Sequence, residues 1–282
     1  MRPTALPAPP QCIVTLDDGM TLTYRELGTG APVVLLHGWP TSSYLWRNVM
    51  PAIARHNCVL ALDLPGFGGS DKPTDASYSF RFFGQAIDDF LAALEIDRVG
   101  LAVHDLGGPV GVHWAIRNRE RVDRLALLNT LLYARPSWAA IAFVVGVRLP
   151  GTRDFLTSRR GLDLAMRVGI ANRDRVTDEV LEGVRAPFAT REARRALAKA
   201  GHGLSPKGFR EIERALPELR WPVRAVYGEQ DKILPDVAKT MAKVKRDIPH
   251  AEVIPLPAFG HFLQEDDPEK VGGLLAEFFS PD

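Results

Sequence analysis

The chain has 282 residues, a formal net charge of +1 and 46% hydrophobic residues, ordinary values for one large domain or for one domain with an insertion. The balanced charge predicts neither nucleic acid nor a membrane as a partner, and no apolar run reaches the ~20 residues of a transmembrane helix. The start, MRPTALPAPPQ, lacks the apolar stretch of a secretory signal. Two cysteines, Cys12 and Cys58, are too few for a disulfide framework, so we expect a cytoplasmic protein of undetermined oligomeric state.

Segments typical of strands alternate with segments typical of helices along most of the chain. Residues 12–27 contain two alternating apolar and polar runs around Asp18 and Gly19, which is typical of a hairpin. Continuous aliphatic runs, typical of strands buried on both faces, occupy residues 32–38, 58–66, 98–105, 122–130 and 222–231, with a weaker case at 251–257. Amphipathic segments such as residues 83–96 separate most of these runs. The pattern predicts an α/β fold: a mostly parallel central sheet flanked by helices.

The alternation stops after Thr130, and helix-like segments rich in arginine follow, such as residues 191–203. We therefore predict a first part of the core at residues 1–133, an inserted helical cap at 134–216 and a second part of the core at 217–282. The predicted cap contains 16 lysines and arginines against 9 aspartates and glutamates. Solvated helix faces explain this balance most simply, and attraction of an anionic substrate is the alternative.

The stretch GLAVHDLGGPVG, residues 100–111, predicts a strand that enters a glycine-rich turn and then a helix. The pattern small–x–nucleophile–x–small is met by residues 103–107, with Asp105 in the nucleophile's place. Small residues flank such an elbow because its backbone is strained and neighbouring segments approach closely. The free N–H groups at the start of the following helix favour a developing negative charge.

Three other segments supply candidate partners for Asp105. The loop LLHGWPTSS predicts that the backbone N–H of Trp39 joins that of Leu106 as a pair of oxyanion donors. The segment VYGEQDKILP supplies an acid, Asp231, with Glu229 as a weaker candidate, and LPAFGHFLQEDDP supplies His261. The order nucleophile, acid, histidine is the order expected for this architecture.

A carboxylate at the elbow restricts the chemistry. With an ordinary pKa near ~4, it is ionised at neutral pH without help from a base. Attack on an acyl carbon would give a high-energy anhydride, whereas attack on a saturated carbon gives an ester that water activated by His261 can hydrolyse. Asp105 therefore predicts displacement at a carbon–halogen bond or at an epoxide ring. A ligand-binding descendant of the fold, without turnover, is the alternative.

Along nearly its whole length the chain resembles the α/β-hydrolase superfamily, and most of all its haloalkane dehalogenases and epoxide hydrolases. The resemblance is carried by HGWPTSSYLWRNVMP, DLPGFGGSDKP, HDLGG, GVHWAIRNRERV and GHFLQEDDP. It implies a cap domain at the predicted insertion and a pocket between cap and core. The reactants would be a small molecule and water, with a haloalkane as first choice and an epoxide as second. No metal-ligand spacing and no nucleotide-binding fingerprint occurs, so we predict neither metal nor cofactor.

Two positions depart from the family pattern. Dehalogenases similar to this chain usually hold the halide with a tryptophan after the nucleophile and an asparagine after His-Gly, where this chain has Leu106 and Trp39. The indole N–H groups of Trp39 and Trp138 are therefore candidate donors to the leaving group, with packing as the alternative. His37 is expected beside the substrate pocket, as an anchor of the oxyanion loop. Epoxide hydrolases similar to this chain use cap tyrosines, and only Tyr133 borders the predicted cap.

Overall fold

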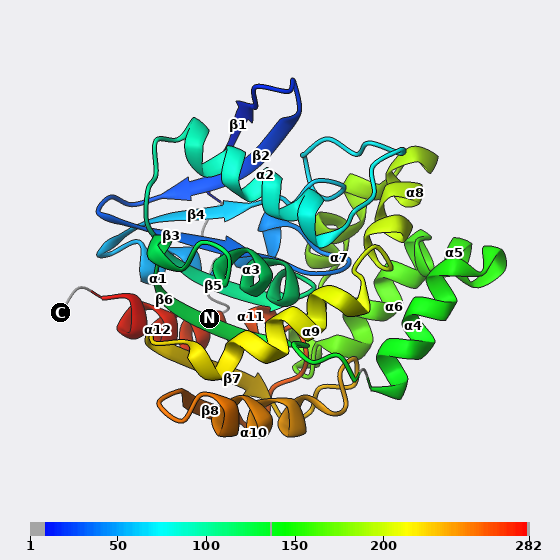
Figure 1. Ribbon diagram of the computed structural model, residues 1–282. Helices are drawn as coiled ribbons and strands as arrows, with labels where there is room; N and C mark the ends of the chain where they lie inside the picture. The colour runs from blue at the N-terminus through cyan, green and yellow to red at the C-terminus, as the bar shows by residue number, and fades with distance from the viewer. Residues whose placement is uncertain (1–8, 136, 281–282) are drawn as a thin grey trace.

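A single eight-stranded sheet forms the centre of the computed structural model, which describes residues 9–135 and 137–280 (Figure 1). The strands are β1 Gln11–Thr15, β2 Thr21–Leu27, β3 Ala31–Leu36, β4 Asn57–Leu62, β5 Val99–Asp105, β6 Val122–Thr130, β7 Val223–Gly228 and β8 Glu252–Leu256. Their order across the sheet is β1-β2-β4-β3-β5-β6-β7-β8. The β1–β2 and β2–β4 pairs are antiparallel, and all others are parallel. The predicted mostly parallel sheet and its N-terminal hairpin are confirmed.

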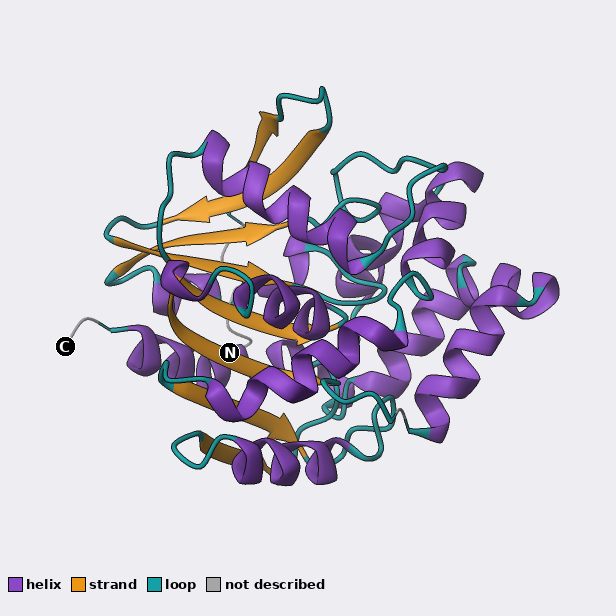
Figure 2. Cartoon of the chain, viewed as in Figure 1, coloured by secondary structure: helices purple, strands orange, loops and turns teal. Residues whose placement is uncertain are grey.

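Helices cover both faces of the sheet, which explains why its central strands are aliphatic throughout (Figure 2). Successive residues of a strand point to opposite faces. In β5, Leu101 and Val103 belong to one buried cluster, whereas Ala102, between them, belongs to the other. The helices of the core are α1 Met50–Ile53, α2 Phe80–Ala93, α3 Gly107–Ala115, α10 Val237–Asp247, α11 Leu263–Asp266 and α12 Pro268–Phe279, with the short 3-10 turns η1 Ser43–Trp46 and η2 Arg119–Arg121.

The amphipathic pattern at residues 83–96 corresponds to α2. Phe83, Ile87 and Phe90 recur at helical spacing and are buried against the sheet. The helix begins earlier than predicted because the side chain of Ser79 accepts a hydrogen bond from the backbone N–H of Phe82, as an N-cap does.

Between β6 and β7 the described residues form helices and no strand. They are α4 Trp138–Arg148, α5 Pro150–Leu156, α6 Arg159–Gly169, α7 Asp178–Arg185, α8 Arg191–Ala200 and α9 Pro206–Ala215, with 3-10 turns η3 Arg173–Arg175, η4 Ala186–Phe188 and η5 Leu216–Glu218. In Figure 1, α4 to α8 gather beyond the carboxyl ends of the parallel strands. This is where the predicted cap would lie, although its boundaries stay a prediction. Nowhere in residues 9–135 and 137–280 is a helix long and apolar enough to cross a membrane.

Candidate active site

Asp105 stands at the carboxyl end of β5 with a φ of 48°, in the left-handed region that side chains rarely adopt. The surroundings hold this strained backbone in place. A Cβ on Gly38 would overlap the Asp105 carboxylate, and one on Gly107 would overlap the carbonyl oxygen of His37. The hydroxyl of Thr130 donates a hydrogen bond to the carbonyl of Asp105 at 2.7 Å. The close approach at Gly107 explains the small residue that the elbow pattern requires at this position.

The two predicted oxyanion donors both bind the Asp105 carboxylate. The backbone N–H of Trp39 donates to Oδ1 at 2.8 Å, and the backbone N–H of Leu106 also donates to the carboxylate. Asp105 is 7% exposed, so these bonds act in a site with little water. One carboxylate oxygen is therefore held by the backbone that would stabilise a negative charge there.

His261 lies between two carboxylates and is fully buried. Its Nδ1–H donates to Oδ2 of Asp231 at 2.8 Å, and its Nε2 lies 3.5 Å from Oδ2 of Asp105. The second separation is longer than the roughly 3 Å of an ordinary hydrogen bond. Oδ1 of Asp231 accepts hydrogen bonds from the backbone N–H groups of Ile233 and Leu234 at 2.8 and 2.7 Å. The backbone thus orients Asp231, and Asp231 orients the imidazole.

The three groups shift one another's pKa values. Burial alone lowers the pKa of His261, but the negative charges of Asp231 and Asp105 outweigh it and raise that pKa to about 10. Burial alone raises the pKa of each aspartate, but hydrogen bonding to His261 and its positive charge outweigh it and hold both pKa values below their usual range. At neutral pH the imidazolium therefore stands between two carboxylates, and Asp105 carries the charge a nucleophile needs.

Sequence reasoning missed Asn129, which ties the acid to two neighbouring segments. Its Nδ2 donates to Oδ2 of Asp231 at 2.7 Å and to the carbonyl of Gly260 at 3.1 Å. Its Oδ1 accepts a hydrogen bond from the backbone N–H of Gly228 at 2.9 Å. The available signal was a single amide directly after the aliphatic stretch LALL, at the carboxyl end of β6.

His104 holds the backbone of His261 in place. Its Nε2 donates to the carbonyl of His261 at 2.9 Å, and the two rings are 4.8 Å apart. Burial, followed by the positive charge of His261, lowers the pKa of His104 to about 3. His104 is therefore uncharged at neutral pH and holds the backbone of His261 without competing for its proton.

His37 anchors the oxyanion loop through both of its ring nitrogens, and its place beside a substrate pocket stays a prediction. The ring is fully buried, and its Nε2 accepts a hydrogen bond from the backbone N–H of Leu64 at 3.1 Å. Its Nδ1 therefore carries the proton and donates to the carbonyl of Gly38 at 3.0 Å. With both nitrogens bound to backbone, neither can contact a substrate.

The prediction that the Trp39 indole holds the leaving group is corrected by the structure. The indole N–H of Trp39 donates to the carbonyl of Leu197 in α8 at 3.1 Å, and its ring packs edge-on against Phe143 of α4 with centroids 4.7 Å apart. Trp138 is 73% exposed at the start of α4, and its role as a donor stays a prediction. The Trp39 indole is already bound and Leu106 has no side-chain N–H, so neither of these two side chains is free to hold a halide.

The elbow, the backbone donors and the histidine held by a second carboxylate meet at the carboxyl edge of a parallel sheet, which is the arrangement of an α/β hydrolase. The model of the alpha/beta hydrolase fold family matches residues 31–268. The chain belongs to this family, within its group of haloalkane dehalogenases and epoxide hydrolases.

Known proteins of both kinds resemble the chain over nearly its full length. A haloalkane dehalogenase of Sphingobium indicum is 32% identical, covering 92% of each chain, and one of Agrobacterium fabrum is 30% identical, covering 91% of this chain and 88% of that protein. A soluble epoxide hydrolase of Corynebacterium sp. (strain C12) is 29% identical, covering 94% and 95%. The solved haloalkane dehalogenase of Bradyrhizobium elkani superposes with a TM-score of 0.84 at 30% identity, covering 95% and 96%. The chain is thus a hydrolase of the dehalogenase and epoxide hydrolase type.

Proposed function

We propose that the protein hydrolyses the carbon–halogen bond of a small haloalkane through a covalent alkyl ester on Asp105. One observation carries the proposal: the two oxygens of this carboxylate have different environments. Oδ1 is bound by the backbone N–H of Trp39 at 2.8 Å, whereas Oδ2 faces Nε2 of His261 at 3.5 Å. Oδ2 is therefore the oxygen free to attack, and Oδ1 is the oxygen placed to carry the later oxyanion.

In the first step, Oδ2 attacks the saturated carbon, a carbon–oxygen bond forms, and the halide leaves with the electrons of the carbon–halogen bond. In the second step, Nε2 of His261 takes a proton from water, and the resulting hydroxide attacks Cγ of Asp105. The backbone N–H groups of Trp39 and Leu106 stabilise the oxyanion on Oδ1. The bond from Cγ to the alkyl oxygen then breaks, and this oxygen takes the proton from His261 to give the alcohol. The carboxylic acid left on Asp105 gives up its proton, which restores the carboxylate.

The two steps occur with His261 in different protonation states, and the charges of the site set these states. In the free protein, Asp231 and Asp105 together raise the pKa of His261 to about 10, so it is protonated at neutral pH. Ester formation removes the negative charge of Asp105, and the pKa of His261 must fall. The histidine thus becomes a usable base at the stage where water has to be activated.

Epoxide hydrolysis is the second candidate, and one observation favours it. Trp39 and Leu106 present no free side-chain N–H to a departing halide, whereas an epoxide oxygen stays on the substrate and needs a proton instead. Tyr133 is a poor acid for that proton, because burial raises the pKa of its hydroxyl well above the usual range. A non-catalytic ligand receptor is a third possibility, and the intact Asp105–His261–Asp231 arrangement argues against it.

A substrate panel separates these functions. Chloro-, bromo- and iodoalkanes and small epoxides are incubated with the protein, and halide release and diol formation are measured. Asp105→Asn is the matched control, because it keeps the shape of the side chain and removes its charge. Halide release that depends on Asp105 supports the first proposal. Diol release alone supports the second, and binding without either product supports the ligand receptor.

We also propose a cytoplasmic location, which two unpaired cysteines support.

A further inference from the structure

The strongly exposed large hydrophobic side chains of the described residues are concentrated in one part of the chain. Six of the seven lie between residues 138 and 164, and the seventh, Ile13, lies in β1. The six are Trp138, Ile141, Val145, Leu149, Phe155 and Leu164. Scattered single cases are normal on protein surfaces, whereas a cluster marks a surface that binds something.

Helix α4 carries most of this cluster on one side. Trp138, Ile141 and Val145 are three and four residues apart, so they share a helical face, and Leu149 follows at the helix end. On its other side, Val147 is fully buried and Phe143 packs against Trp39. The helix is thus apolar on the face that holds it to the molecule and also on the face turned to water.

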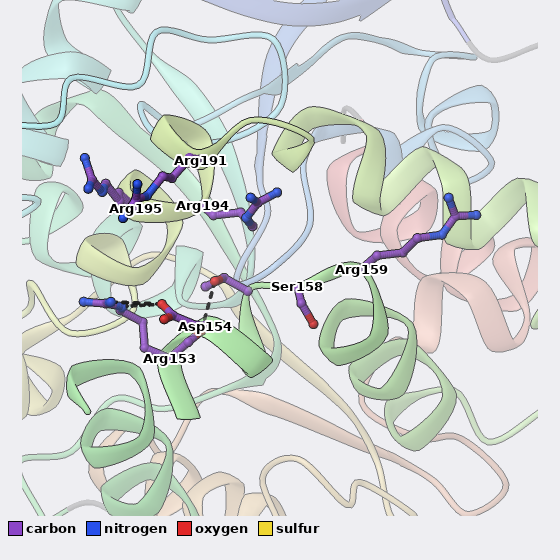
Figure 3. A pocket seen from close by; sticks show the side chains of 8 residues that line it. Arg153, Asp154, Ser158, Arg159, Arg191, Arg194 and Arg195 are labelled. Carbon is purple, nitrogen blue, oxygen red and sulfur yellow. Dashed lines mark hydrogen bonds and ion pairs between the residues drawn. The ribbon is translucent and has the colours of Figure 1, made fainter. Parts of the chain in front are cut away.

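Arginines stand on the same helices as the later members of this cluster, Arg153 with Phe155 in α5 and Arg159 with Leu164 in α6. A groove of about 540 Å³ opens where α5, the start of α6 and the start of α8 meet, and it is lined by Arg153, Asp154, Thr157, Ser158, Arg159, Arg191, Arg194 and Arg195. Its one carboxylate, Asp154, is paired with Arg153. In Figure 3 the guanidinium groups spread in different directions instead of converging on one point. That spread suits several separate phosphates better than one small anion.

Charge decides between the two obvious occupants of this surface. A second copy of the chain, related by a two-fold axis, would bring two caps of the same sign together, each with 16 basic against 9 acidic residues. An anionic lipid surface would attract the same charges, although the net charge of +1 for the whole chain conceals them. Apolar side chains with a tryptophan, bordered by arginines, are the features of helices that lie in a membrane interface.

We propose that the outer surface of the cap, made of α4, α5 and the starts of α6 and α8, docks on lipid bilayers rich in anionic phospholipids. Trp138, Ile141 and Val145 enter the interface between headgroups and acyl chains, and the arginines of the groove contact lipid phosphates. Helix α4 has 11 residues, so it lies in the plane of the interface and does not cross the bilayer. The inner leaflet of a cell membrane, which is anionic, is a surface of this kind.

Sedimentation of the full-length protein with vesicles tests the proposal. Vesicles of equal parts phosphatidylcholine and phosphatidylserine should carry the protein down, and vesicles of phosphatidylcholine alone should not. The double variant Trp138→Ser, Ile141→Ser should bind at least about tenfold more weakly, because two large apolar side chains no longer leave water. Ile13→Ser removes an exposed side chain of the same kind outside this surface and should bind like the wild type.

A second pair of variants tests the charges. Removing Arg191 and Arg195, each replaced by Gln, should weaken binding roughly fivefold per residue at low salt. Arg210→Gln, on the exposed part of α9 outside the groove, should have little effect. Three results would overturn the proposal: no dependence on phosphatidylserine, equal losses for Ile13→Ser and the Trp138 variant, or reversible dimers in sedimentation-velocity runs without lipid that only the Trp138 variant abolishes. The last result would assign the surface to self-association.

Discussion

Trp39 connects the candidate nucleophile to the predicted cap, the helices between β6 and β7. Its backbone N–H donates to Oδ1 of Asp105 at 2.8 Å, and its indole N–H donates to the carbonyl of Leu197 in α8 at 3.1 Å. One residue thus binds the carboxylate through its main chain and a cap helix through its side chain. A movement of α8 therefore reaches the oxyanion loop directly.

Trp39→Phe should loosen the cap while preserving the chemistry. The variant keeps the backbone N–H to Asp105 and an aromatic ring against Phe143, and it loses only the bond to Leu197. We expect a loss of about 1 kcal/mol in the free energy of unfolding and a rise in KM with kcat nearly unchanged. A fall of about a hundredfold or more in the rate of halide release would instead identify the indole as a leaving-group donor.

Asn129→Ala should slow ester hydrolysis more than displacement. The variant removes the donor that holds Oδ2 of Asp231, so the acid orients His261 less well, while Asp105 keeps its own contacts. Hydrogen bonds to charged groups contribute about 1.5–3 kcal/mol, which corresponds to roughly a ten- to hundredfold slower second step. Single-turnover experiments that follow product and ester separately measure both steps. Equal slowing of the two steps would place the role of Asn129 elsewhere.

The stability of the protein should fall as the pH rises from 6.5 toward 10. The pKa of His261 is raised from 6.5 to about 10 on folding, so between these values the folded state keeps a proton that the unfolded state has lost. Below pH 6.5 both states are protonated and the stabilisation is complete. Denaturant unfolding of wild type and His261→Gln across this range should show a steeper decline for the wild type. Parallel declines would mean that His261 is not the titrating group.

The two chemical steps should depend differently on pH. Displacement needs only the ionised Asp105, whose pKa is lowered, so its rate should be flat through the neutral range. Ester hydrolysis needs an uncharged His261, so its rate should rise with pH through the pKa that this histidine has in the ester. Rapid quenching of a single turnover at several pH values resolves the two steps. A hydrolysis rate that does not change with pH would remove His261 from the role of base.

The sheet and the candidate catalytic groups were predictable from the sequence for one physical reason. Strands buried on both faces appear as aliphatic runs, and β6 coincides with the predicted residues 122–130. Parallel strands end at one edge, so polar residues that follow such runs meet there, as Asp105, Asp231 and His261 do. A polar residue that follows a strand in the sequence therefore lies at the carboxyl edge of the sheet, because the parallel strands all end there.

The orientations and contacts of individual side chains were less predictable. The partner of the Trp39 indole, Leu197, is 158 residues away in the sequence, and no local pattern indicates such a contact. Trp138 begins a helix that is apolar on every side, so periodicity does not show which face meets water. Asn129 was hidden because one amide at a strand end has no spacing that distinguishes it from a surface residue.

The central claim, that Asp105 forms an alkyl ester which His261 helps to hydrolyse, is tested most directly by mass spectrometry of His261→Gln. Asp105 is ionised without the histidine, so displacement should proceed in this variant while ester hydrolysis stalls. Mixed with a substrate that the wild type turns over, the variant should gain the mass of the alkyl group, and peptide mapping should place that mass on Asp105. Asp105→Asn should show no early adduct. Absence of any adduct on His261→Gln, or an adduct mapped to another residue, would contradict the account.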